Sequence, residues 1–170
     1  IAIGVAKLFG IRVSQNFKYP YFSKDIGDFW KKWHISLSSW FRDYVYIPLG
    51  GSKKGKVLAI RNIFITFLIS GFWHGANWTF IIWGFLHSIL YIPLFLFRNK
   101  KNYKSKKIIN LKTSLLKKII QTVITFLTVM IAWVFFRSDS ITDAFLYLKK
   151  IFSNNLLLSP KNDFLQLSIG

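Results

Sequence analysis

The sequence contains no cysteine, which excludes disulfide bonds, zinc sites with cysteine ligands and thiol nucleophiles. Acidic residues are also scarce, because there is no glutamate and only 6 aspartates stand against 24 lysines and arginines. The formal net charge of +18 would suit a nucleic-acid partner, but the basic residues gather between long apolar runs. That distribution is typical of membrane proteins with positively charged cytoplasmic loops. We therefore expect membrane lipid, and no nucleic acid, as a partner of this chain.

Apolar segments make up much of the chain, in which 52% of residues are hydrophobic and 19% are aromatic. A helix needs about 20 such residues to cross the hydrocarbon core of a bilayer. Residues 78–97 meet this requirement in full, and residues 57–72 and 119–136 come near it, so we expect spans close to these three segments. Residues 98–118 carry nine Lys and Arg and no acid, which predicts that this loop is cytoplasmic. The fold class expected from these features is an all-α, polytopic transmembrane helical protein.

An amphipathic helix is expected to precede the first span, over residues 25–46. Asp25 can cap its start, with Asp28 in its first turn. Apolar residues then recur at gaps of three and four, at Trp30, Trp33, Leu37, Phe41 and Tyr44. Tryptophans on one face and lysines on the other suit a position at the membrane interface.

A second amphipathic helix is expected over residues 141–152, where Ser140 and Asp143 form a capping box. The tail, residues 153–170, has no pattern that indicates a structure. The chain begins inside an apolar stretch without Met, and so we expect residues 1–152 to be part of a larger membrane protein.

His74 is the most informative single residue. It lies in the run SGFWHGANW at residues 70–78, and an ionisable side chain at membrane depth is usually functional. Gly75 leaves space for a substrate to approach the imidazole, and Trp73 can help to exclude water. A desolvated imidazole stays neutral and can take a proton from an attacking hydroxyl. The alternative is a buried histidine that donates to a backbone carbonyl.

The other polar residues in apolar sequence carry weaker indications. His34, at the edge of the apolar face of the predicted 25–46 helix, could point into the same cavity as His74, whereas a structural role is expected for His87. Arg42 and Arg61 could bind a phosphate of a cofactor, or their side chains could extend to the interface. No metal site is expected, because the three histidines are widely separated, and no nucleophile elbow indicates a serine hydrolase.

Several of these runs together resemble a known family. They are DFWKKWHISLSSWFRDYVYIPLGG at residues 28–51, SGFWHGANW at residues 70–78, and WVFFRSD at residues 133–139, with Arg61-Asn62, Trp83-Gly84 and His87 between them. They strongly resemble the membrane-bound O-acyltransferase family, and within it the bacterial branch of alginate O-acetyltransferase membrane subunits. The resemblance extends to about residue 152.

This resemblance implies both the fold and the chemistry. It places His74 at the position of the invariant histidine of the family and His34 at its second active-site histidine, inside a tunnel between helices. Trp73, Gly75 and Asn77 are then expected to contribute to substrate or cofactor binding. The chain would be the C-terminal part of the helical bundle of an acyltransferase in the cytoplasmic (inner) membrane of a bacterium.

The resemblance also implies the substrates and partners. An acetyl group would pass from acetyl-CoA or another acyl thioester, with no tightly bound cofactor, to an extracytoplasmic polysaccharide. A periplasmic or extracellular acetyltransferase would be the protein partner. Two alternatives remain open: D-alanyl transfer to teichoic acid, and a non-catalytic basic scaffold in the membrane.

Overall fold

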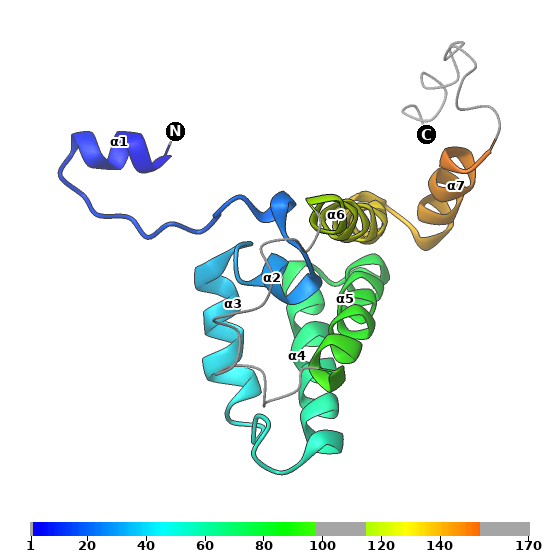
Figure 1. Cartoon of the computed structure of the whole chain (residues 1–170), viewed down its shortest axis with the longest axis horizontal. Helices are drawn as coiled ribbons and strands as arrows, with labels where there is room; N and C mark the ends of the chain where they lie inside the picture. Colours follow the sequence, from blue (N-terminus) through cyan, green and yellow to red (C-terminus); the bar gives the residue numbers. More distant parts are fainter. Residues whose placement is uncertain (1, 98–114, 154–170) are drawn as a thin grey trace.

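The computed structural model describes residues 2–97 and 115–153, in which all regular secondary structure is helical (Figure 1). The elements in chain order are α1 (Ala2–Leu8), η1 (Pro20–Phe22), α2 (Ile26–Trp30), α3 (Ile35–Phe41), η2 (Arg42–Tyr46), α4 (Lys56–His74), α5 (Trp78–Phe97), α6 (Leu115–Arg137) and α7 (Ile141–Ile151). The expected all-α class is therefore confirmed.

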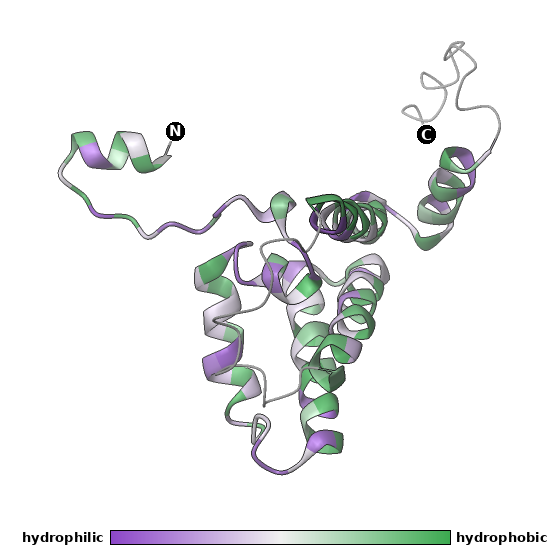
Figure 2. Cartoon of the chain, viewed as in Figure 1, coloured by the Kyte–Doolittle hydropathy of each residue, from purple (hydrophilic) through white to green (hydrophobic). Residues whose placement is uncertain are grey.

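Three of these helices, α4, α5 and α6, are long and apolar enough to cross a membrane. Helix α5 has the bounds predicted for the second span, while α4 and α6 begin earlier and end later than the predicted spans at 57–72 and 119–136. Apolar residues occupy much of the length of these three helices (Figure 2). Many large apolar side chains on α6 are exposed, and hydrocarbon is a suitable environment for such a surface.

Helices α4 and α5 form an antiparallel pair whose backbones come into close contact. A Cβ atom added to Gly71 would collide with the carbonyl of Phe80, and one added to Gly84 would collide with the carbonyl of Phe67. Small residues at such positions allow two helices in a membrane to approach closely. The two glycines therefore set the distance between α4 and α5.

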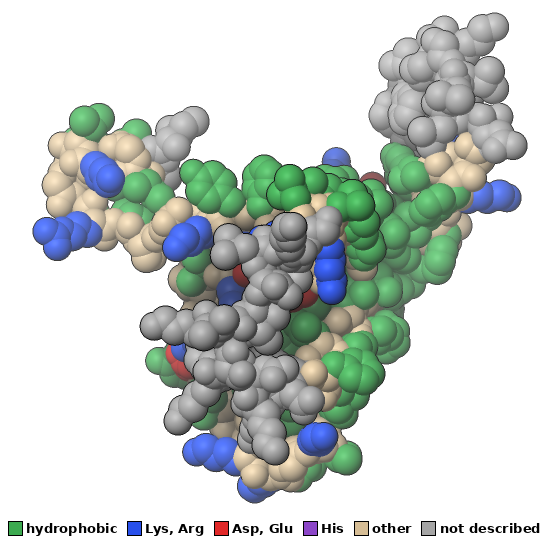
Figure 3. Space-filling view, in the orientation of Figure 1, with side chains coloured by type: hydrophobic (Ala, Val, Ile, Leu, Met, Phe, Trp, Pro, Cys, Tyr) green, Lys and Arg blue, Asp and Glu red, His purple; other side chains and the backbone are tan. Residues whose placement is uncertain are grey.

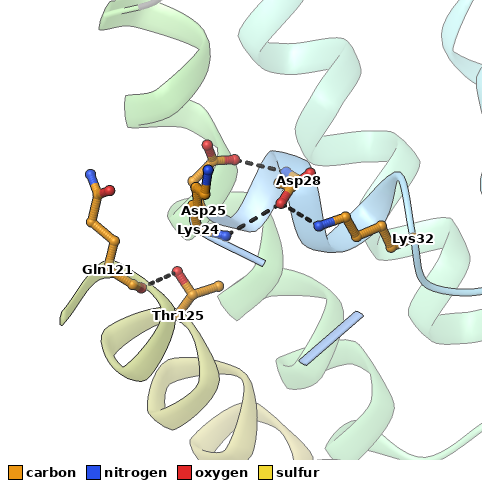
Figure 4. Close-up of polar contacts among 6 residues, drawn as sticks. All are labelled: Lys24, Asp25, Asp28, Lys32, Gln121 and Thr125. Carbon is orange, nitrogen blue, oxygen red and sulfur yellow. Dashed lines mark hydrogen bonds and ion pairs between the residues drawn. The ribbon is translucent and has the colours of Figure 1, made fainter. Parts of the chain in front are cut away.

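The short helix α2 packs on α5 and α6. Its residues Ile26 and Phe29 form a buried core with Val129 of α6. At its start the Asp28 amide donates to the Asp25 carboxylate (2.7 Å), and the Asp28 carboxylate accepts from Lys32 Nζ (2.7 Å) and from the Lys24 amide (3.3 Å), as Figure 4 shows. This local network begins the helix as expected.

The single helix predicted for residues 25–46 is wrong. The chain leaves the helical conformation after Trp30, and His34 adopts a left-handed backbone with φ of 43° and ψ of 55°. The next helix, α3, begins against Asn16, whose carboxamide oxygen accepts from the Ser36 amide (2.9 Å) and hydroxyl (2.6 Å). Its continuation, η2, is a π-helix. The chain therefore forms two helices where periodicity indicated one, and the second begins at hydrogen bonds to a residue twenty positions earlier.

The last helix agrees with its predicted cap. The Asp143 amide donates to the Ser140 hydroxyl (3.1 Å), and α7 follows over Ile141–Ile151. It packs on α6 through an edge-to-face contact between Phe135 and Phe145. Most of the basic loop predicted at 98–118 and nearly all of the tail at 153–170 lie outside the described residues.

A group of basic residues lies at one end of the α4–α5 pair. Lys and Arg side chains stand out at the lower end of the molecule (Figure 3), where Figure 1 shows the turn between η2 and α4. Lys53 and Lys54 lie in this turn and Lys56 begins α4. His74 ends the same helix, so the basic turn and His74 lie at opposite ends of α4.

Candidate functional site

A cavity of about 570 Å³ lies between α2, α3 and η2 on one side and α4 and α5 on the other. It extends from His34 and His74 at one end to Arg42 and Tyr46 near the basic turn. A volume of this size is typical of sites for small molecules and cofactors. Both histidines and one of the two arginines predicted from the sequence therefore border a single space.

His74 reaches this cavity from the last residue of α4. Its ring packs edge-on against Trp73 (4.9 Å between centroids), Trp83 (5.3 Å) and Phe136 of α6 (4.9 Å). The side chain is half-buried, and Gly75 ends the helix directly after it. These aromatic rings restrict the imidazole and leave it open on the side of the cavity.

His34 is the residue that directly precedes α3, and its side chain lines the cavity. Its left-handed backbone turns the chain between α2 and α3, and its ring contacts Phe17 at 5.8 Å. The Nδ1 atom is buried and has no hydrogen-bond partner among the described residues. The side chains of His34 and His74 both line this cavity. The predicted convergence of the two side chains on one cavity is thus what the geometry shows.

Arg42 lines the opposite end of the cavity and forms a bidentate ion pair with its neighbour. Its Nε atom donates to Asp43 Oδ1 (2.7 Å) and its Nη2 atom to Oδ2 (3.0 Å). The hydrogen bonds from Arg42 hold the pKa of the Asp43 carboxyl below its ordinary value. The pair is solvent-exposed and lies in the π-helix η2. The guanidinium is therefore charged, held in place and available to an anion.

The other predicted binding residues lie outside the lining of the cavity. Trp73 is 56% exposed and packs on His74 and Phe41, and Gly75 faces the ring of Phe80. Asn77 caps the start of α5 by accepting from the Thr79 amide (3.1 Å), and it donates to the Asp139 carbonyl (2.9 Å). Their direct contact with a substrate stays a prediction.

Arg61 likewise faces away from the cavity lining, and its neighbour has a structural role. Arg61 donates to the carboxamide oxygen of Asn62 through Nε (3.2 Å) and Nη2 (3.0 Å). The buried Asn62 in turn donates to the carbonyls of Leu49 (3.1 Å) and Gly51 (3.0 Å). The Arg61-Asn62 pair thus connects the turn after η2 to α4 through hydrogen bonds.

Several cavity residues had no signal in the sequence. Ser70 and Thr66 lie in the apolar stretch of α4, and Tyr46 follows the predicted amphipathic face. Burial raises the pKa of the Tyr46 phenol, so this hydroxyl stays protonated at neutral pH. Only the fold shows that these side chains face the same space as the histidines.

The side chains that line the cavity offer acid–base chemistry. In residues 2–97 and 115–153, no three His, Asp or Glu side chains gather closely enough to hold a metal ion. Two imidazoles with aromatic neighbours, beside a cavity large enough for a substrate, can accept and donate protons.

The sequence profile of the membrane-bound O-acyltransferase family matches residues 1–109, which include both cavity histidines. The chain belongs to the membrane-bound O-acyltransferase family. With three helices long and apolar enough to cross a membrane, it is a multi-pass member of that family.

Relatives in this family carry several names. The chain is 46% identical over 142 residues to a probable alginate O-acetylase of Pseudomonas syringae pv. tomato, which covers 83% of the chain and 25% of the relative. It is 42% identical over 149 residues to a peptidoglycan O-acetyltransferase of Helicobacter pylori, covering 88% of the chain and 27% of the relative. A teichoic acid D-alanyltransferase of Bacillus subtilis is 41% identical over 112 residues, covering 62% and 28%. The chain thus spans about a quarter of the length of these curated relatives.

Proposed function

We propose that this chain carries the transfer site of a membrane-bound O-acyltransferase, with His74 as general base and His34 as its partner in the same cavity. The observation that supports this proposal most directly is that both side chains border one cavity of about 570 Å³. Membership in the family supports the class of reaction. The proposed reaction moves an acetyl group from a thioester to a hydroxyl of an extracytoplasmic polysaccharide.

In the proposed mechanism, the imidazole of His74 accepts the proton of the acceptor hydroxyl as the hydroxyl oxygen attacks the thioester carbonyl carbon. The carbon–sulfur bond then breaks, and the departing thiolate takes the proton from the imidazolium. A neutral imidazole is required at the start, and the aromatic contacts of His74 with Trp83 and Phe136 favour that state. His34 would orient the acceptor or the thioester carbonyl across the cavity.

Arg42 is the proposed binding site for a phosphate of the acyl donor. The hydrogen bonds to Asp43 use Nε and Nη2, so Nη1 can donate to a phosphate oxygen. Of the two arginines predicted from the sequence, Arg42 lines the cavity. It lies toward the basic turn, which the distribution of positive charge assigns to the cytoplasm. Acetyl-CoA would therefore enter from the cytoplasm, with its thioester directed toward His74.

The names of the relatives give two alternatives for the acceptor. Alginate and peptidoglycan are named for two relatives, and both names describe O-acetylation. These names support an acetyl group and a polysaccharide or peptidoglycan acceptor. Location in the inner membrane of a bacterium, and a periplasmic or extracellular acetyltransferase as partner, are part of the proposal. The name of a third relative favours D-alanyl transfer to teichoic acid as the second candidate.

The proposal can be tested with the full-length protein in proteoliposomes. Radiolabelled acetyl-CoA and D-alanyl carrier protein are supplied in parallel as donors, and label is measured in a soluble polysaccharide and in lipoteichoic acid. Transfer of acetyl to the polysaccharide supports the first candidate. Transfer of D-alanine alone supports the second, and no transfer from either donor contradicts the proposed function.

A further inference from the structure

His87 is a fully buried histidine in the middle of a membrane-spanning helix, with 0% of its surface exposed. Its imidazole lies roughly parallel to the rings of Phe29 and Phe67, at 6.3 and 6.2 Å between centroids. The indoles of Trp30 and Trp83 meet it edge-on at 5.0 and 4.8 Å. We call these four rings the His87 cage.

Three side chains in this region bury polar atoms that lack hydrogen bonds. Neither ring nitrogen of His87, nor the Nε1 atom of Trp30 or Trp83, has a partner among the residues that the structure describes. Each indole can only donate, whereas a neutral imidazole has one donor and one acceptor. The unprotonated nitrogen of His87 is therefore the one acceptor that these three side chains offer to an indole N–H.

Packing alone does not explain a histidine at this position. Phenylalanine has a ring of similar size and would fill the cage without burying two polar nitrogen atoms. Burying polar groups without partners is unfavourable. We therefore infer that the nitrogen atoms of the imidazole have a role beyond packing.

Trp83 connects this buried histidine to the transfer site. It lies one helical turn before His87 on α5, lines the cavity, and contacts the imidazole of His74 at 5.3 Å and that of His87 at 4.8 Å. A displacement of the Trp83 indole would therefore change both the wall of the cavity and the surface against which His74 packs.

We propose that His87 is a positioning residue, whose unprotonated nitrogen accepts a hydrogen bond from the Trp83 indole N–H and so fixes the ring that supports His74. The two rings are already in contact, and the indole nitrogen and both imidazole nitrogens are buried without a hydrogen-bond partner among the described residues. This inference rests on the proposed function of His74.

The test compares His87→Phe with His87→Gln in the full-length protein. The phenylalanine fills the cage but accepts no hydrogen bond, whereas the glutamine carbonyl can accept one. We expect His87→Phe to accumulate normally and to lower kcat for acetyl transfer on the order of tenfold, with little change in KM for acetyl-CoA, and His87→Gln to restore part of the rate. Wild-type kcat in His87→Phe would overturn the proposal.

A matched control separates positioning from loss of packing. Phe64→Leu removes an aromatic contact between α4 and α5, where Phe64 meets Phe85 at 5.7 Å, away from the lining of the cavity. This variant should keep the wild-type kcat. If Phe64→Leu lowers kcat as much as His87→Phe does, general loosening of the helix pair explains both, and the proposed role of His87 is wrong.

A spectroscopic measurement tests the hydrogen bond independently of activity. The ultraviolet resonance Raman difference between wild type and Trp83→Phe isolates the indole band that reports N–H hydrogen bonding. A bonded indole N–H that becomes free in His87→Phe supports the proposal, and a free N–H in the wild type overturns it. Because this readout needs no turnover, it decides whether the hydrogen bond between Trp83 and His87 exists even if acetyl transfer is absent and the proposed function fails.

Discussion

The imidazoles of His34 and His74 border the same cavity, one from the residue before α3 and the other from the last residue of α4. Neither residue lies in the middle of a helix. His34 lies in a left-handed turn, and His74 is followed directly by the extended Gly75. The site therefore depends on two helix termini that the packing of α2, α4 and α5 brings together.

The left-handed backbone of His34 allows its imidazole to be tested apart from its conformation. Glycine and asparagine tolerate φ of 43° at little cost. We predict that His34→Gly and His34→Asn keep wild-type thermal stability but lose most acetyl transfer, because both lack the imidazole. The measurement is the rate of transfer in proteoliposomes beside the Tm in detergent. Full activity in His34→Asn would show that the turn, and not the imidazole, is what the site requires.

The close contact of α4 and α5 predicts that larger side chains at Gly84 destabilise the protein. A side chain there collides with the carbonyl of Phe67, so Gly84→Leu should lower the free energy of unfolding by about 1–3 kcal/mol or more, as overpacking does. Gly4→Ala is the matched control, because open space surrounds that glycine. Thermal unfolding in detergent measures both variants, and equal Tm values would contradict this account of the helix pair.

The buried carboxamide of Asn62 predicts a second stability effect. Asn62→Ala leaves the carbonyls of Leu49 and Gly51 without their donor, which should cost about 1–3 kcal/mol of unfolding free energy. Thr125→Ala removes a back-bond to Gln121 on α6 that is exposed, and so should have little effect. If proteolysis at the turn after η2 is no faster in Asn62→Ala than in Thr125→Ala, the proposed fastening role is wrong.

The Arg42–Asp43 pair predicts how donor binding depends on pH. Since Arg42 lowers the pKa of Asp43, the carboxylate stays charged to a pH below its ordinary pKa of about 3.9. Any stabilisation from the pair is complete above that ordinary value and is lost only as the pH falls through the lowered pKa. KM for acetyl-CoA in the wild type should therefore not change between pH 7 and 5 through this group.

The matched variant for this prediction is Asp43→Asn, which leaves Arg42 without its charged partner. We expect KM for acetyl-CoA to rise by a few-fold at every pH from 5 to 7, consistent with the modest strength of exposed pairs. A rise in the wild-type KM below pH 6 that Asp43→Asn abolishes would contradict the assigned pKa direction.

The spans and the caps followed from local chemistry, and so the sequence was enough to predict them. Hydrophobic length determines where α5 can lie, and the Ser140–Asp143 cap determines where α7 begins. The break at His34 could not be predicted, because Asn16 supplies the hydrogen bonds that start α3 from a distant part of the chain. The spacing of apolar residues describes one face of a continuous helix, and it cannot indicate a hydrogen bond to a residue outside that helix.

The cavity shows the same division between local and distant effects. Trp30, Trp33, Leu37 and Phe41 of the predicted apolar face do line it, although they are divided among α2, the turn after it and α3 rather than lying on one helix. Tyr44, assigned to the same face, is 68% exposed, since the π-helix shifts the register after Phe41. The contribution of Trp83 from α5 depends on the close approach of α4 and α5, which no single segment reveals.

The central claim is that His74 removes the proton of the acceptor hydroxyl, and the most direct measurement is acetyl transfer by His74→Ala in the full-length protein. General-base catalysis contributes roughly 10²–10⁴-fold, so kcat should fall by that range while membrane insertion and protein level stay normal. Radiolabelled acetyl in the polysaccharide, normalised to protein in the membrane fraction, gives the result. A His74→Ala protein that acetylates at a near-normal rate would contradict the catalytic assignment and favour a non-catalytic scaffold.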